Sequence, residues 1–179
     1  MERNFPEALA HTLQFEGGWA NNPNDPGGAT MMGITQRTYN SYLGRDSSQD
    51  ELRHISDAEV AAIYRKLYWD ACRCDELPDG LDLAVFDTAV NTGPTQAARL
   101  LQRTVGVPAD GRIGPKTIVA VNDYVAAHGL HALIEAYTDA RQRFYRLLPT
   151  YVHFGEGWRK RADGMAKLAK ELGLSNQTA

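Results

Sequence analysis

Cysteine is scarce in this chain of 179 residues, which contains only two. Cys72 and Cys74 are separated by a single residue. This spacing suits a disulfide poorly, because the bond needs Cα atoms closer than about 7 Å and well-aimed side chains. A second cysteine pair, which would complete a zinc tetrahedron, is missing. We therefore predict two thiols near a helix end, consistent with synthesis in a reducing compartment.

Long apolar runs are also missing. No segment approaches the roughly 20 apolar residues that cross a bilayer, and the N-terminus lacks the apolar stretch of a secretory signal. With 43% hydrophobic and 23% charged residues, the composition excludes collagen, low-complexity disorder and a disulfide scaffold. The sequence predicts one soluble globular unit, synthesised in the cytoplasm without a signal peptide and not inserted into a membrane.

Several motifs that carry chemistry are absent. The chain has no Gly-x-Ser-x-Gly elbow, phosphate loop, dinucleotide fingerprint or His-Glu-x-x-His motif, and its 5 histidines are scattered. We therefore predict no metal site and no cofactor. A pI near 5.9, without a recognisable nucleic-acid motif, argues against nucleic acid as a partner.

The net charge of −3 hides an asymmetry between the two halves. Residues 1–92 hold 15 acidic and 7 basic side chains, whereas residues 93–179 hold 7 acidic and 12 basic ones. Solvated helix faces are the simpler interpretation, and an anionic polymer held by the basic half is the alternative. Much of the positive charge lies on Arg141, Arg143, Arg146, Arg159, Lys160, Arg161, Lys167 and Lys170.

Helical periodicity dominates the chain, and no segment longer than a few residues alternates with period two, so the predicted fold is mainly α. A first helix is expected from Phe5 to near Glu16, where two glycines end it. Turn residues fill positions 21–28, and residues 29–34 suit a short strand or hairpin. Later helices are predicted from the capping box Ser56-Asp57-Ala58-Glu59, over 81–90 as the buried central helix, from 94, from 115 to 129, over 130–148 and from about 157 to 172.

Glu16 is the strongest catalytic candidate. It lies in Phe15-Glu16-Gly17-Gly18-Trp19, between two aromatic residues and before two glycines. Apolar rings around a carboxyl disfavour its charged form, which suits a general acid for glycosidic cleavage. The glycines let a polymer approach the backbone closely. From this motif alone, an ordinary surface glutamate before a glycine stop is the more common explanation.

Asp25 and Thr30 follow in the next loop, and they add weight to the catalytic interpretation. Glycosidases generally need a second carboxylate across the sugar, and a threonine can position the attacking water. Turn formation explains Asp25 equally well, because Asn-Asp-Pro-Gly forms a turn in any case.

Together these motifs resemble the glycoside hydrolase family 108 muramidases, lysozyme-like enzymes of phage lysis cassettes and of some bacterial secretion loci. The resemblance covers about residues 3–172 of the chain. It rests on Glu16-Gly17-Gly18-Trp19, Asn24-Asp25-Pro26-Gly27-Gly28-Ala29-Thr30, Gly33-Ile34-Thr35, Tyr68-Trp69-Asp70, Phe86-Asp87-Thr88-Ala89-Val90-Asn91-Thr92-Gly93, Leu101-Gln102, Gly106-Val107, Asp110-Gly111, Ile113-Gly114-Pro115, Thr117, Gly157-Trp158-Arg159 and Arg161.

The resemblance implies a lysozyme-like fold in a single compact unit. Residues 1–92 would form the catalytic lobe, residues 93–174 a helical peptidoglycan-binding lobe packed on it, and residues 175–179 a tail. The implied reaction is hydrolysis of the β-1,4 bond between N-acetylmuramic acid and N-acetylglucosamine, with Glu16 as the catalytic acid. The order Glu, Asp, Thr is also similar to the triad of phage-type lysozymes, which extends catalytic roles to Asp25 and Thr30.

Other polar and aromatic residues suit a polymer cleft, where a tryptophan can stack on a sugar and amides or hydroxyls can bond it. Helix-end capping explains Asn91 equally well, and helix packing is the simpler explanation of Tyr145. Core packing is favoured for Tyr64, Tyr68 and Trp69. The candidates for substrate binding are Trp19, Thr35, Gln36, Tyr39, Asn91 and Tyr145.

Two other functions fit the same residues. One is a lytic transglycosylase, which uses a single acid and is disfavoured by Asp25. The other is a wall-binding protein that keeps the fold without catalysis. In every case peptidoglycan is the expected partner, and a monomer that acts in the periplasm would reach it through a holin or an export system. The stereochemistry, the crosslink preference and the choice between phage lysis and assisted secretion stay open at this stage.

Overall fold

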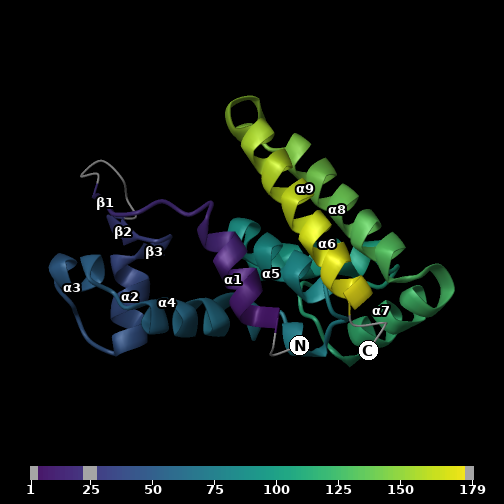
Figure 1. Cartoon of the computed structure of the whole chain (residues 1–179), viewed down its shortest axis with the longest axis horizontal. Helices are drawn as coiled ribbons and strands as arrows, with labels where there is room; N and C mark the ends of the chain where they lie inside the picture. Colours follow the sequence, from purple (N-terminus) through teal and green to yellow (C-terminus); the bar gives the residue numbers. More distant parts are fainter. Residues whose placement is uncertain (1–3, 22–27, 176–179) are drawn as a thin grey trace.

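Helix α5 (Leu81–Thr92) lies at the centre of the structure, a computed structural model that describes residues 4–21 and 28–175. Every residue of α5 from Leu81 to Ala89 is buried. Around it pack α1 (Phe5–Leu13), α6 (Pro94–Thr104), α8 (Leu130–Arg146) and α9 (Tyr151–Ser175), as Figure 1 shows. The predicted buried central helix and the mainly α fold are therefore confirmed.

A small sheet lies at one end of the molecule, away from α8 and α9 (Figure 1). Strands β1 (Ala20–Asn21), β2 (Ala29–Met31) and β3 (Ile34–Thr35) pair antiparallel in that order. Helices α2 (Gln36–Leu43) and α3 (Gln49–Arg53) pack beside the sheet. The short hairpin expected after the turn-rich loop is thus confirmed.

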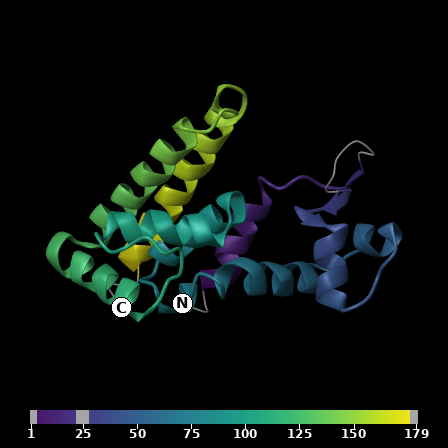
Figure 2. The same cartoon turned by 180° about the vertical axis from the view of Figure 1, so that it is seen from behind.

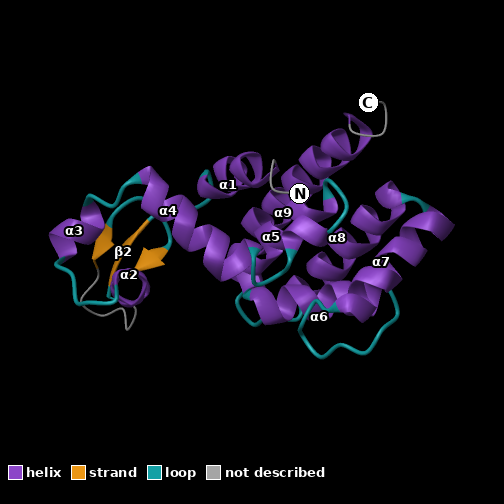
Figure 3. Cartoon of the chain, turned by 90° about the horizontal axis from the view of Figure 1, so that it is seen from below, coloured by secondary structure: helices purple, strands orange, loops and turns teal. Residues whose placement is uncertain are grey.

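Helix α4 (Asp57–Tyr64) connects the small sheet with the core around α5 (Figure 3). It begins at the predicted capping box, continues as the π-helical turn η2 (Arg65–Trp69) and is followed by the short 3-10 helix η3 (Cys74–Glu76). The ring of Trp69 lies 5.3 Å from that of Phe5. Tyr64 and Trp69 are both buried, which confirms core packing for them. Cys72 and Cys74 are buried thiols without a disulfide, also as predicted.

Helices α8 and α9 form an antiparallel hairpin that projects from the body of the molecule (Figures 1 and 2). Helices α6 and α7 (Pro115–His128) each begin at a proline, as the sequence predicts. The predicted start of the last helix near residue 157 is wrong, because α9 begins at Tyr151 and includes Gly155 and Gly157. Packing along α8 offsets the roughly 1 kcal/mol that each glycine costs a helix.

In the described part of the chain, no helix is both long and apolar enough to cross a bilayer. The boundary predicted between residues 92 and 93 falls at Gly93, between α5 and α6. The division into two lobes at this point stays a prediction.

Gly80 sets the distance between the start of α5 and α9, and its replacement tests this contact. The residue has φ +92°, and a Cβ there would overlap the carbonyl oxygen of Ala169. We expect Gly80→Ala to lower the free energy of unfolding by at least about 2 kcal/mol in urea denaturation, through left-handed strain plus separation of the helices. Gly106→Ala is the control, because Gly106 has φ +76° and open space around it. Equal losses for the two variants would show that the α5–α9 contact contributes nothing.

Candidate active site

Glu16 lies in the loop that follows α1, held between two distant parts of the chain. Its side chain is 21% exposed. On one side Oε1 accepts a hydrogen bond from Nη1 of Arg161, in α9, at 3.0 Å. On the other side lies Gly33, in the β2–β3 turn, where a Cβ would stand only 2.8 Å from Oε2. The carboxylate is therefore fixed in position while part of it remains open to solvent.

The surroundings of Glu16 differ from those that the flanking aromatic residues suggest. The ring of Phe15 lies over the guanidinium of Arg161, 5.3 Å from its carbon to the ring centre. The carboxylate thus faces a cation as well as apolar surface, and the flanking residues did not predict this cation. The cause is the long-range packing of α9, which brings Arg161 to Glu16 from 145 residues away.

Asp87 joins Arg161 to a second buried cation. Asp87 is fully buried in α5, and its Oδ1 accepts from Nε of Arg161 at 2.9 Å and from the hydroxyl of Thr12 at 3.1 Å. Its Oδ2 lies 2.7 Å from Nη2 of Arg141, in α8. Burial opposes ionisation, but the two guanidinium groups together hold the pKa of Asp87 below its ordinary value. Asp87 is therefore a buried anion shared by two cations.

Arg141, the second cation, is linked through Tyr145 to Asn91 at the end of α5. Nε of Arg141 donates to the hydroxyl of Tyr145 at 2.6 Å, and that hydroxyl donates to Oδ1 of Asn91 at 2.7 Å. Tyr145 is only 1% exposed, and burial raises the pKa of its hydroxyl. The structure brings these two predicted residues together. Tyr145 is buried and orients the Asn91 side chain, but it does not itself line the pocket beside Asn91.

A groove of about 520 Å³ runs beside Glu16 and Asn91. One wall is the N-terminal part of α9, and the other combines the end of α5 with the loop after α1. A larger hollow of about 660 Å³ follows α8 and α9, but it shares no lining residue with the groove, and Glu135 and Lys170 neutralise each other within it. We place the candidate site in the groove. Its walls include Phe15, Val90, His153, Phe154, Gly157 and Trp158.

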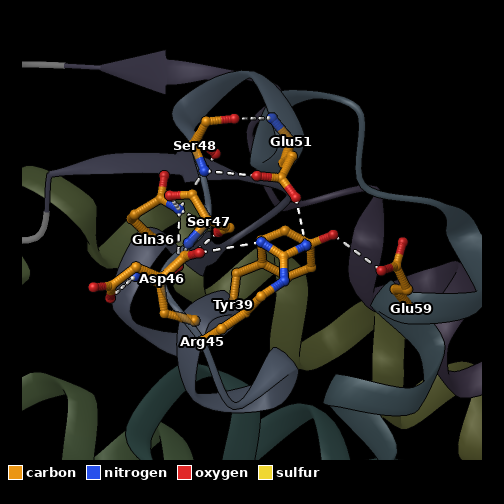
Figure 4. A network of polar contacts seen from close by, with 9 residues as sticks. Gln36, Tyr39, Arg45, Asp46, Ser47, Ser48, Glu51 and Glu59 are labelled. Atoms are coloured by element: carbon orange, nitrogen blue, oxygen red, sulfur yellow. Dashed lines mark hydrogen bonds and ion pairs between the residues drawn. The ribbon is translucent and has the colours of Figure 1, made fainter.

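Three predicted substrate-binding residues make contacts inside the lobe of the small sheet, and Figure 4 shows two of them, Gln36 and Tyr39. The Thr35 hydroxyl caps α2 by accepting from the backbone N–H of Thr38 at 3.2 Å. Nε2 of Gln36 donates to the hydroxyl of Ser47 at 2.7 Å. The buried Tyr39 hydroxyl donates to Glu59 at 3.0 Å. None of the three predicted residues lines the groove.

The predicted residues that remain are Trp19, Asp25 and Thr30, which follow Glu16 in the sequence. Trp19 lies under the guanidinium of Arg53, at 5.8 Å. Thr30 is in β2, opposite Ala20 in β1 and Thr35 in β3. Asp25 lies outside the described residues, so its predicted role stays a prediction. Within the described ranges, no group of three or more histidine, cysteine, aspartate or glutamate side chains could hold a metal ion.

The sequence interpretation quoted Asp87 and Arg161 but gave neither a role in the site, and it did not predict the wall formed by α9. A signal for the first was available, because an aspartate inside an otherwise apolar, buried helix needs a cationic partner. The interpretation of the basic C-terminal residues as solvated or wall-facing is wrong for Arg141 and Arg161, which are buried partners of Asp87. Which cations meet a given anion depends on how helices pack, and local sequence does not encode that.

Comparisons with known proteins show what the chain is similar to. Residues 9–93 match the family described as Glycosyl hydrolase 108, and residues 96–163 match the one described as Predicted Peptidoglycan domain. Among solved structures, that of Brucella abortus SagA is 37% identical, with a TM-score of 0.83 over 97% of each chain. No curated protein matches the chain.

Replacing Asp87 tests whether the buried anion holds α8 and α9 on α5. We expect Asp87→Asn to lower the free energy of unfolding at neutral pH by about 3–5 kcal/mol, because two buried cations lose their shared partner. Since the pKa of Asp87 is lower in the folded state, its contribution is present above the unfolded pKa near 4 and is lost as the pH falls. The difference between the two proteins in urea denaturation should therefore shrink in acid.

Asp163→Asn is the matched control for this prediction. Asp163 is half exposed and lies 3.3 Å from Arg159, so the same chemical change should cost less than about 1 kcal/mol. A loss for Asp87→Asn no larger than the control's would mean that the buried cluster does not hold the helices.

Proposed function

Because the chain belongs to the glycosyl hydrolase 108 family, we propose that it is an N-acetylmuramidase with Glu16 as its general acid. Family membership makes it a glycoside hydrolase that acts on peptidoglycan. The proposed bond is the β-1,4 linkage between N-acetylmuramic acid and N-acetylglucosamine. One observation carries the choice of acid: among the described residues that line the groove, Glu16 is the only carboxyl.

The hydrogen bonds of Glu16 fit this role. A guanidinium can only donate, so Oε1 accepts from Arg161 and the catalytic proton belongs on Oε2. Protonation of the glycosidic oxygen releases one sugar, and the resulting carboxylate stands beside the positive charge that develops on the other. In this proposal Asp25 is the second carboxylate and Thr30 positions the water that completes hydrolysis.

The two regions of the chain have different roles in the proposed enzyme. Residues 1–92 supply Glu16, and residues 93–174 bind peptidoglycan and supply Arg161. We further propose that the protein acts as a monomer in the periplasm, with a holin or an export system giving it access to the wall.

Glu16→Gln tests the general acid. The variant keeps the shape of the side chain and removes the proton, so the rate of sacculus hydrolysis should fall by at least about 10²-fold. Glu156→Gln is the matched control, because Glu156 is exposed, pairs with Lys160 at 2.8 Å and does not line the groove. Near-normal activity of Glu16→Gln would refute the assignment.

Mass spectrometry of the fragments tests the reaction type. Reducing-end N-acetylmuramic acid is the product of the proposed hydrolysis. An anhydro-muramic product would instead identify a lytic transglycosylase, and wall binding without new reducing ends would identify a non-catalytic protein.

Gly33 tests how closely the carboxylate must be held. A Cβ at Gly33 would press on Oε2 of Glu16 and on the Tyr64 hydroxyl, 2.7 Å away, whereas one at Gly44, at the end of α2, would meet nothing. Both glycines have positive φ, +74° and +69°, so both alanine variants should lose about 1–2 kcal/mol of stability. Only Gly33→Ala should also lose hydrolytic rate, by about 10- to 100-fold, because it displaces Glu16. Equal rates in the two variants would contradict this.

A further inference from the structure

The groove contains an amide and an aromatic wall that the proposed bond cleavage does not use. Asn91 and Val90 form one side, and Phe154 lies on the other, in the first turns of α9. These groups belong to neither the general acid nor its ion pair. Their chemistry indicates which part of a sugar they contact.

The orientation of the Asn91 amide follows from its partners. Arg141 can only donate, so the Tyr145 oxygen accepts from Nε and the single Tyr145 hydrogen goes to Asn91. Oδ1 of Asn91 is therefore the acceptor, and the NH₂ group is the free end of the amide. No described residue accepts a hydrogen bond from this NH₂ group. Asn91 thus offers the groove hydrogen-bond donors.

Phe154 supplies an apolar platform whose position is fixed. Phe154 is 57% exposed, which is unusual for a phenylalanine. The ring lies 5.9 Å from that of Trp158 with an interplanar angle of 32°, and Trp158 lies 5.2 Å from Tyr145 at 39°. The rings of Phe154, Trp158 and Tyr145 thus pack against one another in that order. Tyr145 is also the residue that orients Asn91. A ring held in this way binds a ligand at little cost in conformational entropy.

We propose that Asn91, Val90 and Phe154 form a subsite that recognises the N-acetyl group of a sugar bound beside Glu16. The Asn91 NH₂ group donates to the acetamido carbonyl oxygen, the acetamido methyl packs on Val90, and the pyranose ring packs on Phe154. The groove is open at Gly157, where an added Cβ would meet nothing within 4 Å. The proposal deepens the proposed function and rests on it for the placement of the glycan.

The subsite discriminates against sugars that have lost the acetyl group. A de-N-acetylated glucosamine presents an ammonium, which can only donate and so leaves the Asn91 donors without a partner. It also lacks the methyl group that would cover Val90. A site built to bond one substrate group rejects an analogue that lacks it, because its own polar groups are left unpaired. Removal of acetyl groups from the glycan should therefore weaken binding in this groove.

Calorimetric titration of the Glu16→Gln protein tests the subsite without any turnover. The probes are the tetrasaccharide of N-acetylglucosamine and its fully de-N-acetylated counterpart, at a pH where the amine is protonated. The Glu16→Gln change removes an anion that would attract the ammonium and leaves Arg161 without that partner, so every second substitution is compared with the Glu16→Gln protein itself. We expect the acetylated probe to bind at least about tenfold more tightly.

Second substitutions in the same protein identify the groups responsible. Asn91→Asp has the same shape and still accepts from Tyr145, but it replaces the donors with an anion, so the preference should reverse in favour of the amine. Phe154→Ala should weaken both probes by about tenfold. Val152→Ala is the control, because Val152 is 87% exposed, lies two residues before Phe154 in α9 and does not line the groove. It should bind both probes as the parent does.

An Asn91→Asp protein that keeps the original preference, or a Phe154→Ala protein with unchanged affinities, would overturn the proposal. Failure of the proposed function appears differently. If the unmodified chain releases no fragments from sacculi while the acetyl preference holds, the function falls and the subsite stands. If hydrolysis proceeds but neither substitution alters binding, the subsite falls and the function stands.

Discussion

The buried charge of Asp87 is the constraint on which the groove depends. A carboxylate in the middle of an apolar helix is strongly destabilising unless cations reach it, so α8 and α9 must both pack against α5. Each cation has a second partner at the surface of the cluster. Arg161 holds Glu16, and Arg141 holds Tyr145, which orients Asn91. One anion therefore positions both polar ends of the groove.

This arrangement also makes the two matched regions of the chain interdependent. Glu16, Asp87 and Asn91 lie in the region that matches the hydrolase family, whereas Arg141 and Arg161 lie in the region that matches the peptidoglycan domain. The aromatic wall of the groove comes from the second region as well. The C-terminal helices are thus part of the candidate active site, in addition to any role in binding the cell wall.

Local sequence predicted the features that depend on local interactions. Proline at the first turn, the capping box at Ser56 and the apolar pattern of α5 each identified a helix correctly, because their causes lie within one or two turns. The start of α9 was wrong because packing on α8 outweighs two glycines. Gln36 and Tyr39 have the chemistry of sugar ligands, but capping and loop contacts inside their lobe use them. The local motif around Glu16 and the family resemblance both indicated that residue, and only the packing of α9 revealed its partner Arg161.

The charges of the cluster are matched to the proposed reaction. With Glu16 ionised, Glu16 and Asp87 carry two negative charges against the two positive charges of Arg141 and Arg161, so the cluster is neutral. A proton on Glu16 leaves one positive charge in excess within a largely buried site. Transfer of that proton to the glycosidic oxygen restores neutrality and places a carboxylate against Arg161. In the proposed reaction, the guanidinium that fixes the geometry of Glu16 thus also stabilises the carboxylate left after proton transfer.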